Sequence, residues 1–217
     1  MLTGLLLASG LCWTATYLLI IQRGVADKTY GMPIVALAAN LSWEFIFSVV
    51  RPHTGVQHVV DIVWLTLDLV IAYTALRFGP REFAYLSRPV FYAGFAATMV
   101  LAYLGVDTVS REFDAGKGAY AAFGQNLMMS GLFLAMLASR GGLRGQSIWI
   151  AAAKFAGTAF ASIGFWRYGD HPHSAVLAYL YVANAVVDVA YLTAVAVVRA
   201  RAGAVTGQET EAVTLRR

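Results

Sequence analysis

The stretch AANLSWEFIFSVV, residues 38–50, sets a single glutamate, Glu44, inside an apolar run of membrane-helix character. Burial of an unpaired carboxylate among apolar groups is strongly unfavourable unless the group is neutralised or paired. Ionisable residues within membrane helices usually face the interior of a helical bundle and mark a functional path. The stretch therefore predicts a membrane helix that contributes to a functional site.

The composition of the whole chain indicates an integral membrane protein. Of its 217 residues, 59% are hydrophobic and only 13% are charged, which is about half the charged fraction of a soluble domain. The single cysteine, Cys12, excludes an internal disulfide and a cysteine-based metal cluster. We interpret the net charge of +4 as a signal of membrane topology and expect no nucleic-acid binding.

Seven apolar stretches each approach the ~20 residues that a helix needs to cross a bilayer, and period-2 alternation typical of a β-barrel is absent. They cover residues 3–22, 32–50, 59–77, 89–106, 118–139, 147–166 and 174–198. We therefore predict an all-α, integral membrane bundle of seven transmembrane helices. One domain is expected over residues 1–200, followed by a flexible cytoplasmic tail over 201–217.

The distribution of basic residues predicts the orientation of this bundle. With seven spans, eleven of the sixteen Lys and Arg residues fall on the side that holds the C-terminus, and four fall on the other side. Because Lys and Arg are enriched in cytoplasmic loops, we expect the N-terminus outside and the C-terminus in the cytoplasm.

Four ionisable residues lie well inside predicted spans: Glu44, Asp68, Lys154 and Asp188. In two of the helices an asparagine precedes the acid by one turn, as Asn40 before Glu44 and as Asn184 before Asp188. This spacing allows a hydrogen bond between amide and carboxyl group. The alternative interpretation is a structural ion pair, with the amides joining helices.

Aromatic residues accompany these acids along the helices, and six of them are candidates to line a pocket: Trp43, Phe45, Trp64, Tyr73, Tyr181 and Tyr191. His171 and His173 resemble a metal-binding tract only superficially, and we predict no metal and no cofactor. A carboxylic acid in an apolar pocket can remain protonated at neutral pH. Such an acid could protonate an apolar substrate, and aromatic faces could stabilise the cation that results. That chemistry fits cyclisation of a membrane-soluble prenyl chain.

The sequence resembles a known family, the small seven-helix membrane-bound terpene cyclases, over about residues 8–198. The resemblance rests on GMPIVALAANLSWEFIFS (31–48), DIVWLTLDLVIAY (61–73) and YVANAVVDVAYL (181–192). Fungal members act in meroterpenoid and indole diterpenoid pathways, and bacterial members act in indole sesquiterpenoid pathways of the drimentine type. The resemblance implies a metal-independent cyclase whose substrate carries a prenyl chain, expected to be farnesyl, on an indole or other aromatic acceptor.

The resemblance also implies which residues are catalytic. Its two acids correspond to Glu44 and Asp188, which we expect to form a hydrogen-bonded pair, and Asp68 corresponds to a third acid with a structural role. Initiation by an olefin or by an epoxide stays open, as does the immediate proton donor. Lys154 has no counterpart in the pattern; if it pairs with one acid, that acid would be ionised and suited to a supporting role.

Two other functions fit a chain with seven spans. A small metabolite transporter is the main alternative, although the chain lacks the Pro-Gln pairs typical of small sugar transporters. A retinal protein would need a lysine in its last helix, whereas Lys154 lies in the sixth. We therefore predict a multi-pass terpene cyclase, and the composition favours a bacterial plasma membrane. The sequence does not indicate an oligomeric state.

Overall fold

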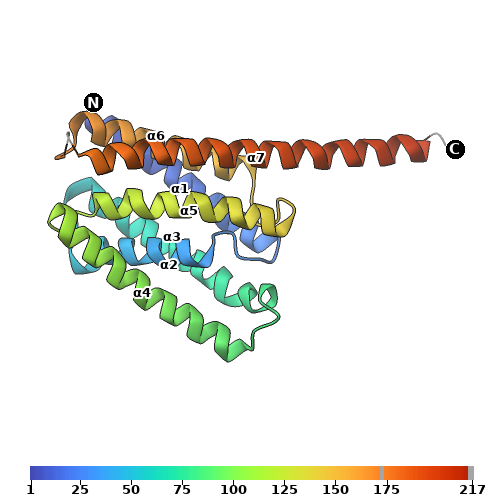
Figure 1. Ribbon diagram of the computed structural model, residues 1–217, viewed down its shortest axis with the longest axis horizontal. Helices are drawn as coiled ribbons and strands as arrows, with labels where there is room; N and C mark the ends of the chain where they lie inside the picture. Colours follow the sequence, from blue (N-terminus) through green and yellow to red (C-terminus); the bar gives the residue numbers. More distant parts are fainter. Residues whose placement is uncertain (172–173, 215–217) are drawn as a thin grey trace.

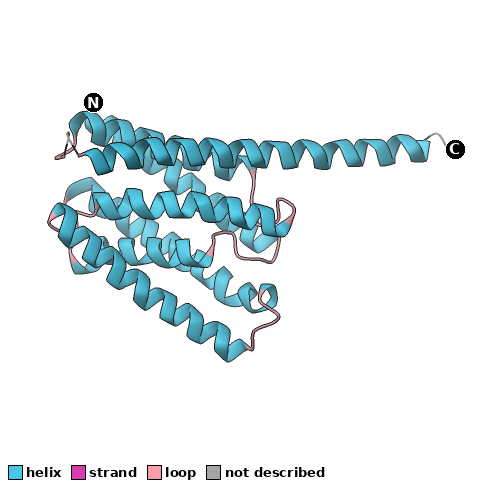
Figure 2. Ribbon diagram, viewed as in Figure 1, coloured by secondary structure: helices cyan, strands magenta, loops and turns pink. Residues whose placement is uncertain are grey.

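The computed structural model describes residues 1–171 and 174–214, and the side chains of residues 1–171 and 174–202. Over this range the chain forms seven helices and no strand (Figures 1 and 2). The helices are α1 (Leu2–Ala26), α2 (Ile34–Phe45), α3 (Gly55–Glu82), α4 (Arg88–Asp114), α5 (Ala119–Arg140), α6 (Ile148–Tyr168) and α7 (Ala175–Thr214). The predicted all-α bundle is thus confirmed. The N-terminus and the end of α7 at Thr214 lie at opposite ends of the molecule (Figure 1).

Local sequence signals set the helix boundaries. Pro33 immediately precedes α2, and Pro89 lies in the first turn of α4, where a missing N–H is tolerated. The side chain of Ser147 caps α6 by accepting a hydrogen bond from the backbone N–H of Ile150 at 3.2 Å. Gly141 ends α5 in the left-handed conformation that favours glycine.

Two boundaries differ from the prediction. Helix α3 continues to Glu82, through Pro80, although the sequence predicted a connection from Phe78 onward. Helix α7 continues to Thr214, where we expected a flexible tail; residues 215–217 of that tail lie outside the described part. Hydropathy detects where a chain leaves the apolar phase, whereas a helix with satisfied backbone hydrogen bonds can continue into water.

Six helices are long and apolar enough to cross a membrane, and the shorter helical segment Ile34–Val50 completes the set within the described residues. This segment consists of α2 and a π-helical turn, η1 (Ile46–Val50). Every residue from Ala36 to Glu44 is buried, because α2 packs against α3, α4 and α5. A helix that is buried on all sides has few polar positions, so each polar group on α2 must be satisfied within the protein.

The helices pack in an arrangement that exposes apolar side chains outward. Helices α1, α6 and α7 lie together on one side, α5 lies beside α7, and α4 flanks α2 (Figure 1). Large apolar side chains such as Leu101 and Trp149 are about two-thirds exposed on this outer surface. An outward-facing apolar belt is what a lipid environment requires.

Candidate active site

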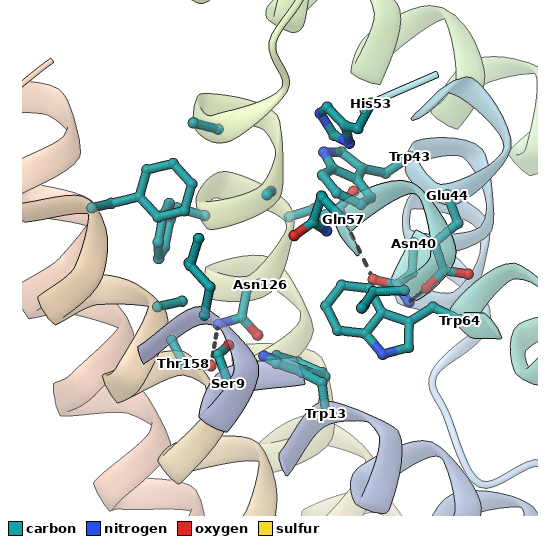
Figure 3. Close-up of a pocket in the computed structure, with 18 of the residues that line it drawn as sticks. Ser9, Trp13, Asn40, Trp43, Glu44, His53, Gln57, Trp64, Asn126 and Thr158 are labelled. Atoms are coloured by element: carbon teal, nitrogen blue, oxygen red, sulfur yellow. Dashed lines mark hydrogen bonds between the residues drawn. The ribbon is translucent and has the colours of Figure 1, made fainter. Parts of the chain in front are cut away.

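A cavity of about 390 Å³ lies between α1, α2, α3, α5 and α6. Its walls are mainly aromatic and aliphatic, with the side chains of Trp13 and Trp64 (Figure 3) among them. Phe123 also lines it. Its volume is within the range of small-molecule sites, ~300–1,000 Å³. The cavity is formed by the N-terminal parts of α1, α3 and α5, and it reaches the loops that hold His53 and Lys117. It therefore occupies the half of the bundle that contains the N-terminus.

Glu44 lies on the wall of this cavity and is 1% exposed. Its Oε1 accepts hydrogen bonds from the Tyr17 hydroxyl at 2.7 Å and from Asn40 Nδ2 at 3.1 Å. One oxygen of the carboxyl group is therefore held by two donors, and the carboxyl group also interacts by hydrogen bonding with that of Asp68.

Asn40 joins this carboxyl group to a second one. Asn40 Nδ2 also donates to Asp68 Oδ2 at 2.9 Å and contacts the Tyr17 hydroxyl. Asp68 is fully buried, so Glu44 and Asp68 share an amide in an apolar environment. Two adjacent carboxylates that repel each other cannot both be readily ionised there. The predicted hydrogen bond between Asn40 and Glu44 is present, and Asp68 belongs to the same cluster.

Asp188 belongs to a separate buried cluster. Its Oδ1 accepts hydrogen bonds from Lys154 Nζ and from the Ser130 hydroxyl, both at 2.7 Å. Lys154 Nζ also lies 5.5 Å from the centre of the Trp13 ring. Asp188 is not part of the cavity wall.

The expected hydrogen-bonded pair of Glu44 and Asp188 is therefore wrong for the part of the chain that the structure describes. Glu44 bonds to α1 and α2, whereas Asp188 bonds to α5 and α6. Helical periodicity shows which residues share a face, but it does not show which neighbouring helix that face meets. Asp188 instead has a buried basic partner, Lys154, on the neighbouring helix α6.

The expected hydrogen bond between Asn184 and Asp188 is also wrong. The amide group of Asn184 donates to the backbone oxygens of Phe123 and Leu180, at 3.0 and 2.8 Å. Its Oδ1 accepts from Asn126 Nδ2 at 2.9 Å. Asn184 is therefore hydrogen-bonded to Asn126, a cavity residue that our sequence analysis did not predict.

Two of the six predicted aromatic residues line the cavity. Trp43 is fixed by a hydrogen bond from its indole N–H to the backbone oxygen of Gly118 at 2.9 Å, and Trp64 by one to Thr14 at 3.1 Å. Gly118 has φ +84°, and a Cβ there would collide with Phe47. Glycine therefore permits the close approach that positions Trp43.

The other four aromatic residues lie elsewhere. Phe45 and Tyr73 are 43% and 62% exposed on the outer surface. Tyr181 packs edge-on against Phe123 outside the cavity wall, and Tyr191 is fully buried against Phe133. Phe45 directly follows Glu44 and so turns to a different face of α2. Tyr181 and Tyr191 share the face of Asp188, but they pack against side chains of α5 outside the cavity wall.

Several cavity residues were missed, and Tyr17 is the most important of them. Trp13 and Tyr17 lie one turn apart on α1, and both line the cavity. Their spacing shows a common face, but the sequence of α1 contains no acid that would have drawn attention to it. Tyr17 acquires its role only because α1 packs against the helices that hold the acids.

The loop end of the cavity is closed by a polar junction. His53 Nδ1 lies 2.7 Å from Asp61 Oδ2, and His53 Nε2 lies 3.2 Å from the backbone oxygen of Lys117. Burial lowers the pKa of His53, but the hydrogen bond with Asp61 and the attraction to its charge outweigh burial and raise the pKa above its usual value. Since both ring nitrogens face acceptors, the geometry fits an imidazolium that donates from each.

We found no group of three His, Cys, Asp or Glu side chains suited to a metal ion within the described residues. Of the two histidines that resemble a metal-binding tract in sequence, the structure describes His171, whereas His173 lies outside the described residues.

Comparison with known proteins identifies the class to which this fold and cavity belong. Residues 1–200 match the family of Pyr4-like transmembrane terpene cyclases. The chain is 32% identical to the Pyr4-family terpene cyclase mfmH of Annulohypoxylon moriforme over 201 residues, covering 87% of this chain and 82% of the relative. It is 38% identical to the terpene cyclase pyr4 of Aspergillus fumigatus over 169 residues, or 73% and 67% of the two chains. No solved structure matches the chain.

The chain therefore belongs to the Pyr4-like transmembrane terpene cyclases. It is a multi-pass integral membrane protein and an enzyme of the terpene cyclase class. This membership decides between the cyclase and the transporter in favour of the cyclase. These two relatives are fungal proteins.

Proposed function

We propose that this enzyme cyclises a prenyl chain, farnesyl in the first instance, on an indole or other aromatic acceptor, with Glu44 as the initiating acid. The observation that carries the proposal is the position of Glu44 on the wall of an apolar cavity, with Oε1 bound by Tyr17 and Asn40 and a second carboxyl group, Asp68, beside it. Two carboxyl groups that share one buried network favour a proton on one of them, and Glu44 is the one that lines the cavity.

The chemistry follows from this geometry. As Glu44 gives its proton to the terminal olefin or epoxide, negative charge develops on its carboxyl group. The Tyr17 hydroxyl and the Asn40 amide already point at Oε1, so they stabilise that charge without rearrangement. Trp13, Trp64 and Phe123 present aromatic faces to the carbocation that forms in the cavity.

Asp188 has a supporting role in this proposal. Its Oδ1 is occupied by hydrogen bonds from Lys154 and Ser130, and its carboxyl group lies outside the cavity wall, so it is not placed to protonate a substrate there. The bond with Asp188 also holds Lys154 beside the ring of Trp13, which lines the cavity. Asp188 therefore supports the cavity wall and its electrostatic field, while Glu44 delivers the proton.

The membrane arrangement is also part of the proposal. The excess of basic residues on the side of the C-terminus supports a cytoplasmic C-terminus and an external N-terminus. The cavity would then lie in the outer half of the bilayer, within reach of a prenylated substrate dissolved in lipid. We propose a bacterial plasma membrane on compositional grounds.

The test uses membranes that contain the full chain, with farnesylated indoles and their terminal epoxides as substrates in deuterated water. An isomer of the olefin that retains one carbon-bound deuterium supports proton transfer to carbon, and an isomer of the epoxide with only exchangeable label supports epoxide opening. Glu44→Gln should abolish both reactions, whereas Glu112→Gln, at an exposed position on α4, should keep them. A folded Glu44→Gln enzyme that still cyclises would overturn the assignment of the acid.

A further inference from the structure

The α5 wall of the cavity contains a buried acceptor that the proposed proton transfer does not use. Asn126 is 7% exposed and lines the cavity, and its Oδ1 has no hydrogen-bond partner among the described side chains. Figure 3 places its amide at the cavity edge on the side opposite Glu44, with the nitrogen directed at Thr158. An unpaired buried carbonyl oxygen is unfavourable, so it requires an explanation.

The orientation of this amide is fixed by groups that cannot exchange their roles. The backbone oxygens of Phe123 and Leu180 are acceptors only, so the amide nitrogen of Asn184 must face them. The Oδ1 of Asn184 is therefore the atom that meets Asn126, and it too is an acceptor. Asn126 must present its nitrogen there.

The second hydrogen of the Asn126 amide is also assigned. It is donated to Thr158 Oγ1 at 2.9 Å, and the Thr158 hydroxyl in turn donates to the backbone oxygen of Lys154 at 3.0 Å. With both hydrogens used, a flip of the Asn126 amide would set oxygen against oxygen at Asn184. The carbonyl oxygen of Asn126 is therefore the atom left without a partner among the described residues, buried just behind the cavity wall.

A fixed carbonyl dipole beside an apolar cavity attracts positive charge within it, even without direct contact. A prenyl chain has no hydrogen-bond donor along its length, so this oxygen gains nothing from the hydrocarbon before reaction. It gains a partner once a carbocation is present, and groups that act only at that stage accelerate the reaction. The neighbouring Gln125 also has a carbonyl oxygen without a hydrogen-bond partner among the described residues. Its amide group, however, is held by only one long hydrogen bond, which its Nε2 donates to Asn40 Oδ1 at 3.4 Å, so its oxygen is less firmly oriented.

We propose that the carbonyl oxygen of Asn126 stabilises the carbocation at a stage after protonation, and that Asn184 is a positioning residue that aims this oxygen. The inference rests on the proposed function of Glu44. The proton from Glu44 adds to one end of the terminal double bond, and the π electrons of the next double bond then close a ring and move the positive charge along the chain. Asn126, across the cavity from Glu44, stabilises the displaced charge without forming a bond.

The test measures the ratio of fully cyclised to partly cyclised product in membranes, because this ratio does not depend on the amount of folded enzyme. Asn126→Leu keeps a similar volume and removes the dipole, so we expect the ratio to fall about tenfold as the cation loses its proton early, to the Glu44 carboxylate. Asn184→Leu should shift the ratio in the same direction, although Asn184 does not line the cavity. Val60→Leu alters the cavity wall without changing polarity and controls for shape.

Three results would overturn the inference. An unchanged ratio in folded Asn126→Leu removes the cation-stabilising role. A higher KM with an unchanged ratio would mean that this oxygen accepts a hydrogen bond from an N–H group of the substrate instead. A normal ratio in Asn184→Leu removes the positioning role. If Asn126→Leu does not accumulate, Asn184→Leu and Thr158→Val, each of which removes one anchor of the amide, carry the test. An active Glu44→Gln enzyme would instead refute the proposed function itself.

Discussion

Replacement of Tyr17 by phenylalanine tests the proton-transfer geometry directly. The change removes one hydroxyl, whose hydrogen bond to Glu44 Oε1 is 2.7 Å long. The ring stays, so its edge-to-face contacts with Trp13 and Trp64, at centroid distances of 5.9 and 6.2 Å, are retained. The fold should therefore persist while the developing carboxylate loses one of its two donors.

The magnitude follows from the charge on the acceptor. A hydrogen bond to a charged group contributes about 1.5–3 kcal/mol, and each ~1.4 kcal/mol is a factor of ten in rate. We therefore expect kcat to fall about 10- to 150-fold. KM should change little, because the hydroxyl points at Glu44 rather than at the substrate. Asn40 still donates to Oε1, so activity is reduced but not lost.

The assay is cyclisation rate against substrate concentration in detergent or membranes, with Tyr191→Phe as the matched control. Tyr191 is also fully buried, but its hydroxyl has no hydrogen-bond partner among the described residues and it lies outside the cavity wall. Its removal should leave kcat near that of the unmodified enzyme. A Tyr17→Phe enzyme with unchanged kcat would refute the claim that this hydroxyl stabilises the conjugate base.

Two further predictions concern stability, measured by thermal unfolding in detergent. Lys154→Met should destabilise the fold by about 3–5 kcal/mol, because it leaves Asp188 buried without its partner, and adding Asp188→Leu should recover much of that loss; a double variant no more stable than the single one would contradict this. The His53–Asp61 contact should be at full strength below about pH 6.5, the usual pKa of histidine, and should weaken as the pH rises through the raised pKa of His53. The melting temperature should therefore fall over that interval in the unmodified protein and less so in His53→Gln, and an identical pH dependence of the two proteins would count against a charged His53.

The sequence predicted the acids and the membrane fold for a common reason. Glu44, Asp68, Lys154 and Asp188 stand out because an ionisable group in an apolar helix is rare and costly. The structure buries all four of them, each with a polar partner. Local spacing also gave the contact between Asn40 and Glu44, since both residues belong to one helix face.

What local spacing could not give is the partner on another helix. Asn184 has the same spacing to Asp188 as Asn40 has to Glu44, yet it turns to the backbone of α5 and to Asn126. The two motifs look alike in sequence, and only the identity of the neighbouring helices separates them. The sequence likewise left open which acid Lys154 pairs with. The packing of α6 against α7 places it beside Asp188.

The amino-acid sequence by itself determined that the chain is a helical membrane protein with acids in its interior, because hydropathy and the cost of buried charge act on each helix separately. Tertiary structure alone decided that Glu44 faces the cavity with Tyr17 while Asp188 is paired with Lys154 away from it. It also decided that Trp64 lines the cavity while Tyr73 faces outward. The reason is that a helix presents several faces, and which face meets a cavity, a neighbour or lipid depends on how all seven helices pack together.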